Sequence, residues 1–289
     1  MFAEEAFMLN FLPCEKTIVS CLDVIPLVLP NEASGKYLHF LKWAYKGMKK
    51  ASHILANSEY TKQDIVKHLG ISEDKISVAY PPIQEFFKED GEIPNSFYEK
   101  FSLEKDKEYI LSVGALDLPR KNIKNSLKAF AKFHKNHKDV DFLLVGYTTL
   151  KGNLDDINNQ IERLGIKSCV KIITNVPDED LLGFYNLASV FLFPSLYEGF
   201  GLPPLEAMAC GTPVVSSHVS SIPEVLGDAA VYADPLDPED IAKNIELLMN
   251  DEKLREKKIA QGKERADVYS WKNYGNDTLR VYEKVWKDL

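Results

Sequence analysis

Short apolar runs alternate along this chain with segments whose apolar residues recur at helical spacing, and this alternation constrains the fold more than any other feature. The pattern is typical of parallel sheets whose successive strands are joined by helices. The run 142–145 is apolar at every position, as expected of a strand covered on both faces. We therefore predict an α/β fold with doubly wound parallel sheets. The nine expected strands are 16–21, 53–56, 75–80, 109–113, 142–145, 170–174, 190–193, 213–216 and 230–233.

The segments between these runs carry signals for helix starts and stops. Ser58 can cap a helix that ends before Gly70, and a second helical repeat ends at Gly165. The sequence 237–239 (Asp-Pro-Glu) combines a cap, a first-turn proline and early negative charge. A further helix is expected over 123–137.

The length of 289 residues fits about two domains of roughly 150 residues each. A break at 81–82 (Pro-Pro) leads into an acidic, irregular stretch, so we interpret 83–107 as a linker. Residues 108–270 hold a complete doubly wound domain, whereas 1–82 hold about three strands. We therefore expect the N-terminal domain, 1–82, to be incomplete.

Composition excludes several classes of protein. The net charge of −8 argues against nucleic acid as the main partner, because phosphate binding needs a basic surface. No uncharged apolar run reaches the roughly 18 residues of a membrane span, and no basic, apolar leader follows Met1. The scattered cysteines are expected to be free thiols in a reducing, cytoplasmic compartment. They are Cys14, Cys21, Cys169 and Cys210.

The most specific segment runs from 193 to 213, where a strand ends at Pro194 and a glycine-rich turn leads into a helix that starts near Pro203. Turn amides and a helix N-terminus favour anion or polyol binding at the carboxyl end of a strand. Glu198 in the turn and Glu206 on the helix can point into one cleft and accept hydrogen bonds from a sugar or ribose diol. Two glutamates eight residues apart are usually solvated surface charges, but the flanking turn favours a site.

A second segment, 111–122, also follows a strand and precedes a helix. Gly114 allows a tight turn there, and Arg120 with Lys121 offers two cations for a diphosphate. Adjacent basic residues in a loop can equally be solvated, so this signal is weak alone.

These segments, together with 221–225 (Ser-Ile-Pro-Glu-Val), resemble retaining glycosyltransferases of family 4, the group 1 enzymes. The resemblance extends over nearly the whole chain, including 23–26 (Asp-Val-Ile-Pro) and 56–62 (Ala-Asn-Ser-Glu-Tyr-Thr-Lys). It implies the GT-B fold, with two Rossmann-like domains facing a cleft. It also implies that a terminal helix, 271–289, returns toward the N-terminal domain.

The resemblance further implies roles for individual residues. Glu198 would contact hydroxyls of the transferred sugar and Glu206 the ribose, whereas Arg120 and Lys121 would neutralise the leaving diphosphate. Amides of Phe200, Gly201 and Leu202, which follow Gly199, would complete the cradle, and Asn175 and Val176 would lie beside the base. Such enzymes use no cofactor and no divalent metal, because cations and a helix dipole stabilise the leaving group.

Two departures from the family fall on the acceptor side. Leu22 stands where the family usually has a histidine, and the glycine-rich loop of the first N-terminal strand is missing. Three explanations stay open. The sequence is part of a longer protein, another chain completes the acceptor site, or the protein no longer has a working acceptor site.

Weaker signals favour ordinary surface positions. The acidic triplets 139–141 and 178–180 match a metal-binding DxD pattern, but the second is a helix start where acids are expected anyway. His134 and His137 lie one helical turn apart without a third ligand, and His218 is a modest candidate for a donor-site contact. Lysines at 42, 46, 49 and 50 form either a membrane-binding face or the solvated side of a packed helix, and we favour the latter.

The sequence therefore predicts a retaining, metal-independent hexosyltransferase. It would move a mannose- or glucose-like sugar from a nucleotide-diphosphate donor to a hydroxyl of a glycan or lipid-linked acceptor. The main alternative is a non-catalytic nucleotide-sugar-binding module, or the donor half of a split enzyme. A GT-B isomerase acting on the nucleotide sugar itself is a third.

Overall fold

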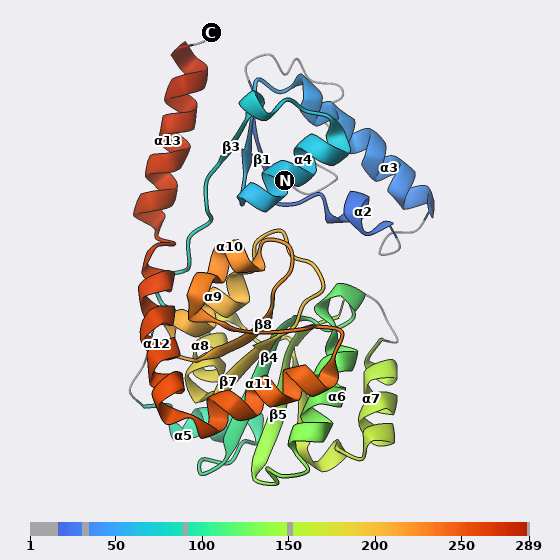
Figure 1. Cartoon of the computed structure of the whole chain (residues 1–289), viewed down its shortest axis with the longest axis vertical. Coiled ribbons are helices and arrows are strands. Elements are labelled where there is room, and N and C mark those ends of the chain that lie inside the picture. Colours follow the sequence, from blue (N-terminus) through green and yellow to red (C-terminus); the bar gives the residue numbers. More distant parts are fainter. Residues whose placement is uncertain (1–16, 31–34, 89–91, 149–152, 288–289) are drawn as a thin grey trace. The chain divides into compact units, whose positions relative to one another are not determined.

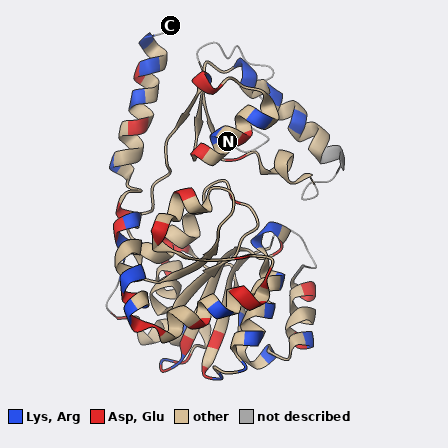
Figure 2. Cartoon of the chain, in the orientation of Figure 1, with Lys and Arg blue, Asp and Glu red and all other residues tan. Residues whose placement is uncertain are grey.

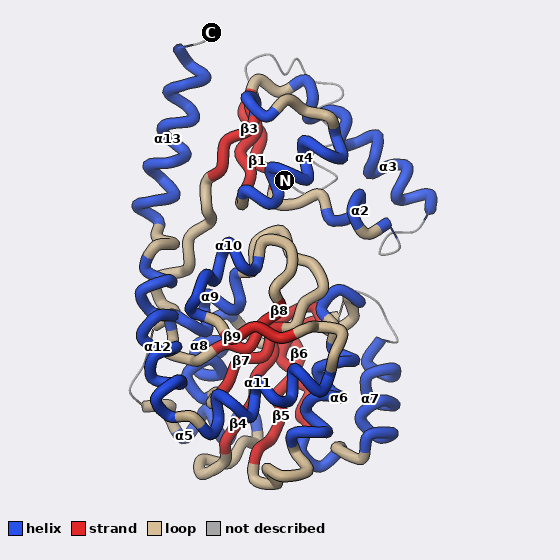
Figure 3. The backbone as a smooth tube through the Cα atoms, viewed as in Figure 1, coloured by secondary structure: helices blue, strands red, loops and turns tan. Residues whose placement is uncertain are grey.

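The computed structural model describes residues 17–30, 35–88, 92–148 and 153–287 (Figure 1). The chain divides into two compact units. Unit 1 comprises Met1–Pro82, Tyr197–Gly201 and Tyr269–Leu289, and unit 2 comprises Ile83–Leu196 and Leu202–Val268. Each unit contains one parallel sheet with helices packed on it (Figure 3).

Unit 1 has a three-stranded sheet in the order β1-β2-β3. Buried side chains of α3 and α4, such as Leu41 and Ile65, pack with Ile54 of β2 in its core. Val281 and Val285 of α13 pack against Leu55 and Ala79. The elements are β1 (Ile18–Cys21), α2 (Ile25–Val28), α3 (Gly35–Lys46), η2 (Gly47–Lys50), β2 (His53–Ala56), α4 (Glu59–Leu69), η3 (Glu73–Lys75), β3 (Ile76–Val78) and α13 (Trp271–Lys287).

Unit 2 has a six-stranded sheet in the order β6-β5-β4-β7-β8-β9, and every neighbouring pair is parallel. Its strands are β4 (Glu108–Ala115), β5 (Val140–Tyr147), β6 (Val170–Thr174), β7 (Val190–Phe193), β8 (Val214–Ser217) and β9 (Val231–Ala233). Its helices are α5 (Asn95–Phe101), η4 (Pro119–Lys121), α6 (Ile123–Phe133), α7 (Asn153–Leu164), η5 (Lys167–Cys169), α8 (Asp178–Leu187), α9 (Leu202–Ala209), α10 (Ile222–Leu226), η6 (Gly227–Ala229), α11 (Pro238–Asn250) and α12 (Glu252–Asp267).

Helices cover both faces of the unit 2 sheet. Leu192 of β7 belongs to the apolar cluster that includes Phe130 of α6 and Ile245 of α11. Its neighbour Phe191 points the other way and contacts the ring of Tyr185 on α8, with ring centroids 5.6 Å apart. Successive strand residues alternate between faces, so both faces are buried. This confirms the predicted α/β class with doubly wound parallel sheets.

All nine expected strands form, with small shifts at their ends. Position 16, where the first was expected to begin, lies outside the described residues. The predicted caps are also confirmed: Ser58 Oγ accepts from Thr61 N at 3.0 Å, and Asp237 Oδ1 accepts from Glu239 N at 2.8 Å. The three described cysteines, at 21, 169 and 210, are buried free thiols, and Cys14 lies outside the described residues.

Two elements differ from expectation. Helix α6 ends at Phe133, four residues early, and Nδ1 of His134 at its C-cap lies 3.1 Å from the Val140 carbonyl. The stretch 83–107, interpreted as a linker, contains α5 and belongs to unit 2. Phe97 of α5 is buried against Phe184 of α8, with ring centroids 4.9 Å apart, so aromatic packing holds this stretch in the fold.

Candidate functional site

In unit 2, the loops that follow β4, β7 and β9 are tied together by one side chain. Asn122 Nδ2 donates to the carbonyl of Pro194 at 2.9 Å and to that of Pro235 at 2.7 Å. The Leu196 amide also donates to the Arg120 carbonyl at 2.7 Å. Parallel strands end at the same edge of a sheet, so these bonds build one ordered rim at the carboxyl edge, where α/β sheets bind ligands.

The predicted basic pair lies on this rim, in the short helix η4. The Lys121 ammonium lies 4.9 Å from the centroid of the Phe193 ring at the end of β7. Its side chain also passes Gly114 at the end of β4, where an added Cβ would be 3.7 Å from Lys121 Cε. Arg120 is half-buried in the same turn. The structure therefore places Lys121 over the carboxyl ends of two central strands.

Glu206 lies on α9 and is held by a neighbouring helix. Tyr185 of α8 donates a hydrogen bond from its hydroxyl to Glu206 Oε2 at 2.7 Å. The Tyr185 side chain is fully buried, with its ring edge-on to Phe87 at 5.5 Å. Burial raises the pKa of Glu206 to about 7, and the Tyr185 hydrogen bond opposes that rise. The carboxyl group is therefore fixed in direction and titrates near neutral pH.

The start of α9 determines which amides can face a ligand. Leu202 is its first residue, and the next two, Pro203 and Pro204, carry no N–H. Among the first three residues of α9, Leu202 is therefore the one that carries a backbone N–H. The sequence analysis assigned this amide to an anion together with those of Phe200 and Gly201, and that assignment stays a prediction.

The turn itself, Tyr197–Gly201, belongs to unit 1. Glu198 is 6% exposed, and the Gly199 carbonyl accepts hydrogen bonds from Ser58 Oγ and Thr61 Oγ1. Glu206 belongs to unit 2. That the carboxyl groups of Glu198 and Glu206 share one cleft stays a prediction.

The proposed base-side residues follow β6, next to β5 in the unit 2 sheet. Asn175 is exposed, has a φ of 58° and donates its amide to the Gly146 carbonyl at 3.3 Å. Val176 is half-buried beside it. Both residues therefore lie at the carboxyl edge that also carries Lys121, and their contact with a base stays a prediction.

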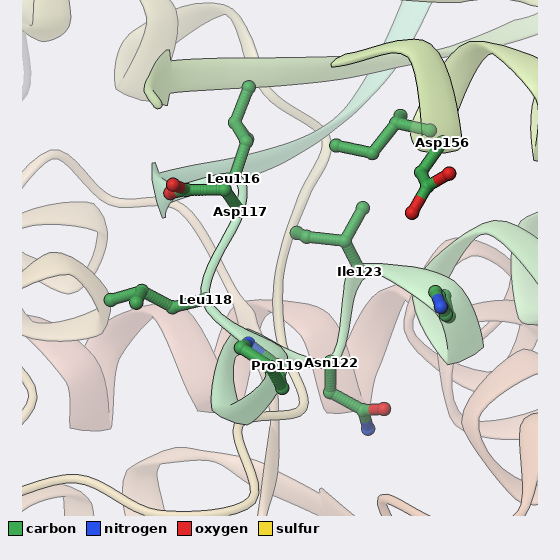
Figure 4. Close-up of a pocket in the computed structure, with 9 residues that line it drawn as sticks. Leu116, Asp117, Leu118, Pro119, Asn122, Ile123 and Asp156 are labelled. Carbon is green, nitrogen blue, oxygen red and sulfur yellow. The ribbon is translucent and has the colours of Figure 1, made fainter. Parts of the chain in front are cut away.

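A pocket of about 270 Å³ is lined by the β4–α6 loop and by residues of α7 (Figure 4). Figure 4 shows Leu116, Ile123 and Asp156 of α7 around it, with the carboxylates of Asp117 and Asp156 pointing in different directions. None of the residues predicted to bind a donor lines this pocket, so it does not contribute to the site assigned above.

The weaker candidates have structural partners. Asp141 forms an ion pair with Lys107 at 3.0 Å, and Asp180 pairs with Lys100 at 2.6 Å. His137 stacks on Phe133, with ring centroids 4.2 Å apart. His218 is exposed and lies edge-on to Tyr232, and His134 is bonded as described above. Within the described residues, no group of three His, Cys, Asp or Glu side chains could hold a metal ion.

The lysines of this segment lie on the exposed side of a packed helix, which fits both of the alternatives given above. Leu41, Tyr45 and Met48 are buried, whereas Lys42 and Lys46 are exposed on α3 (Figure 2). Lys49 and Lys50 of η2 and Trp43 of α3 are exposed as well. None of the helices in the described part of the chain combines the length and apolar character that a bilayer crossing requires.

The sequence analysis missed Tyr185 as a site residue and did not assign a role to Asn122. In the sequence, Tyr185 cannot be distinguished from any other aromatic residue on the buried side of a helix, and no local signal indicates its bond to Glu206. Asn122 carried a weak signal, because asparagine adopts a left-handed conformation more readily than most residues, and here its φ is 59°. Its two carbonyl partners are distant in sequence and could not be inferred.

The fold and this rim define a class of protein: an α/β chain with polar and basic groups at the carboxyl edge of a doubly wound sheet. Comparison with known proteins identifies the family. Residues 95–265 match the family model of glycosyl transferases group 1, and residues 23–85 match that of glycosyltransferase family 4. The chain belongs to the glycosyl transferases group 1 family.

Its relatives include O-antigen chain mannosyltransferase B of Escherichia coli, which is 34% identical over 278 residues covering 93% of this chain and 70% of the relative. The serotype-specific mannosyltransferase WbdA of Escherichia coli is 31% identical over 93% of this chain, which spans 34% of WbdA.

Solved structures confirm the GT-B fold. Anabaena Alr3699/HepE in complex with UDP-glucose matches with a TM-score of 0.78 at 18% identity, over 95% of this chain and 72% of that chain. Sucrose-phosphate synthase from Thermosynechococcus elongatus matches with a TM-score of 0.77 at 19% identity, over 94% and 68% of the two chains.

Proposed function

We propose that this chain transfers a hexose, mannose or glucose, from a nucleotide-diphosphate sugar to a hydroxyl group of a glycan or lipid-linked acceptor, with retention at the anomeric carbon. The observation that carries the proposal is the hydrogen bond from the buried Tyr185 to Glu206 in unit 2, the unit whose sheet carries Lys121 at its carboxyl edge. Relatives named as O-antigen mannosyltransferases favour mannose and polysaccharide synthesis. A structural neighbour in complex with UDP-glucose is consistent with a nucleotide-sugar donor.

Glu206 is the proposed partner of the ribose hydroxyls. Its carboxylate is fixed by Tyr185 through Oε2, and a fixed carboxylate can accept hydrogen bonds from a diol without losing side-chain entropy on binding. Asn175 and Val176 are the proposed contacts of the base, and Glu198 is the proposed acceptor of hydrogen bonds from the transferred sugar.

Arg120 and Lys121 are the proposed partners of the diphosphate, together with the amides of Phe200, Gly201 and Leu202. As the bond between the anomeric carbon and the phosphate oxygen breaks, negative charge grows on the diphosphate. Two cations and oriented amides stabilise that charge without a divalent metal. In a front-face displacement, the acceptor oxygen bonds to the same face of the anomeric carbon, and its proton passes to the departing phosphate oxygen.

A lipid-linked acceptor would bring the protein to a membrane surface from the cytoplasm. The exposed Lys42, Lys46 and Trp43 of α3 support such peripheral contact, because basic and aromatic side chains bind the headgroup region of anionic bilayers. Binding to vesicles with and without anionic lipid, compared with a Lys42→Glu, Lys46→Glu variant, tests this contact.

Transfer from GDP-mannose and UDP-glucose to mannosylated acceptors, with EDTA present, tests the proposed reaction. We expect an α-linked product by NMR, because these donors carry α-linked sugars. A β-linked product contradicts retention, and turnover that EDTA abolishes contradicts the metal-independent mechanism. Donor binding without transfer to any acceptor supports the alternative of a nucleotide-sugar-binding module.

A further inference from the structure

The Tyr197–Gly201 turn and helix α4 both belong to unit 1, although 138 residues separate Thr61 from Gly199. We propose that the hydroxyl groups of Ser58 and Thr61 position the Phe200 N–H of this turn for the donor diphosphate. The inference rests on the proposed function and extends it by naming positioning residues on α4 that touch no reacting atom.

Two buried hydroxyl groups converge on one carbonyl. Ser58 Oγ donates to the Gly199 oxygen at 2.7 Å, and Thr61 Oγ1 donates to the same oxygen at 3.0 Å. Ser58 is 0% exposed and Thr61 is 1% exposed, so water does not compete for these bonds. The two bonds fill the acceptor directions of the carbonyl and fix its orientation.

The orientation of this carbonyl sets the direction of an amide. The Gly199 carbonyl and the Phe200 N–H belong to one planar, trans peptide group, so they point in opposite directions. Holding the oxygen toward Ser58 and Thr61 therefore turns the Phe200 N–H away from α4. Hydrogen bonds to a carbonyl also polarise the peptide group and make its N–H a stronger donor.

The turn is also packed closely against the segment before α2 and bonded to α4 a second time. A Cβ at Gly199 would lie 2.7 Å from Asp23 Cβ and 2.7 Å from the Leu22 carbonyl oxygen, so only glycine fits. The Tyr197 hydroxyl donates to Asp64 Oδ2 of α4. Position 58 caps α4, and positions 61 and 64 follow at spacings of three, so one side of this helix holds the turn.

Thr61→Val tests the proposal, because valine keeps the shape of threonine and removes the hydroxyl. Thr61→Ser restores the donor. Ser77→Ala is the matched control, since it removes a hydroxyl of unit 1 that bonds His53 Nε2 at 2.8 Å and not the turn. Affinity for GDP-mannose and UDP-glucose is measured by calorimetry, and hydrogen exchange is followed in peptides that cover 198–202.

We expect Thr61→Val to weaken binding of the donor about fivefold, the scale of one lost hydrogen bond, and to reduce ligand-induced protection of the Phe200 amide. Thr61→Ser and Ser77→Ala should bind as the wild type does. Equal donor affinity and equal protection in Thr61→Val would overturn the proposal, as would a loss that Thr61→Ser does not restore.

The outcome separates this proposal from the proposed function. If the wild type binds neither GDP-mannose nor UDP-glucose, the proposed function fails. Exchange in the ligand-free protein then still decides whether Thr61 fixes the turn, because we expect faster exchange at 198–202 in Thr61→Val and not in Ser77→Ala.

Discussion

The hydroxyl of Tyr185 donates a 2.7 Å hydrogen bond to Oε2 of Glu206 and joins the buried face of α8 to α9. The tyrosine ring is packed edge-on between Phe87 and Phe191, and its backbone carbonyl accepts from Thr212 Oγ1 at 2.5 Å. These contacts leave the Tyr185 hydroxyl little freedom, so the core of unit 2 fixes the Glu206 carboxylate through this hydrogen bond.

Donor affinity should depend on the protonation of Glu206. Burial raises the pKa of Glu206 to about 7, and hydroxyl groups of ribose donate best to the ionised carboxylate. We therefore expect Kd for the nucleotide sugar to be about tenfold larger at pH 6 than at pH 8. Calorimetry across this range checks the expectation, and Glu206→Gln should remove the pH dependence.

Stability should change with pH through the same group. A carboxyl group whose pKa rises on folding stabilises the fold below its unfolded pKa, and that contribution is lost as the pH rises through about 7. The free energy of unfolding should therefore fall less between pH 5 and 8 in Glu206→Gln than in the wild type. Urea denaturation at each pH measures this difference. A parallel dependence in both proteins would show that Glu206 ionises normally.

Tyr185→Phe should raise the pKa of Glu206 further, because the hydrogen bond that favours the carboxylate is lost. The midpoint of the pH dependence of donor binding should move to higher pH, and the free energy of unfolding should fall by about 1–3 kcal/mol. Tyr109→Phe is the control, since its buried hydroxyl donates instead to the Glu104 carbonyl at 3.1 Å. An unchanged midpoint in Tyr185→Phe would show that this tyrosine does not influence donor binding through Glu206.

Asn122 should stabilise the rim through its backbone conformation and its amide separately. Asn122→Ala loses both hydrogen bonds to carbonyl groups and places alanine at a φ of 59°. We therefore expect the free energy of unfolding to fall by about 3 kcal/mol. Asn122→Gly tolerates this φ and should recover about 1 kcal/mol of that loss. Urea denaturation measures both, and equal losses would mean that backbone strain contributes nothing.

Gly146→Ala should disrupt the unit 2 sheet near the carboxyl ends of its strands. Gly146 pairs with Gly114 between β5 and β4, and an added Cβ would lie only 1.8 Å from the Gly114 carbonyl oxygen. We expect a loss of more than about 3 kcal/mol in the free energy of unfolding. Gly275→Ala in α13 meets no atom within 4 Å and should stabilise by up to about 1 kcal/mol.

The strands could be predicted because each is marked by its own residues. The run 142–145 is apolar at every position, and all four side chains are 0% exposed in β5. The caps at Ser58 and Asp237 are equally local signals. The seven-residue α5 was not predicted, because its formation depends on burial of Phe97 against Phe184, more than 80 positions away.

The site could be predicted only in part for the same reason. Glycines and charges near strand ends locate Lys121 at the sheet edge, but nothing near Tyr185 in the sequence reveals its bond to Glu206. Ser58 was foreseen as a helix cap, whereas its second bond, to Gly199, joins residues 141 positions apart. Contacts of this kind arise from tertiary packing and leave no periodic signal.

Calorimetric titration of the wild type and Glu206→Ala with GDP-mannose and UDP-glucose tests the central claim most directly. We expect the wild type to bind one of these donors, and Glu206→Ala to lose at least roughly tenfold in affinity with a native circular-dichroism spectrum, because the carboxylate accepts charge-assisted hydrogen bonds. Absence of binding by the wild type, or equal affinity in Glu206→Ala, would contradict the assignment of Glu206 to a nucleotide-sugar site.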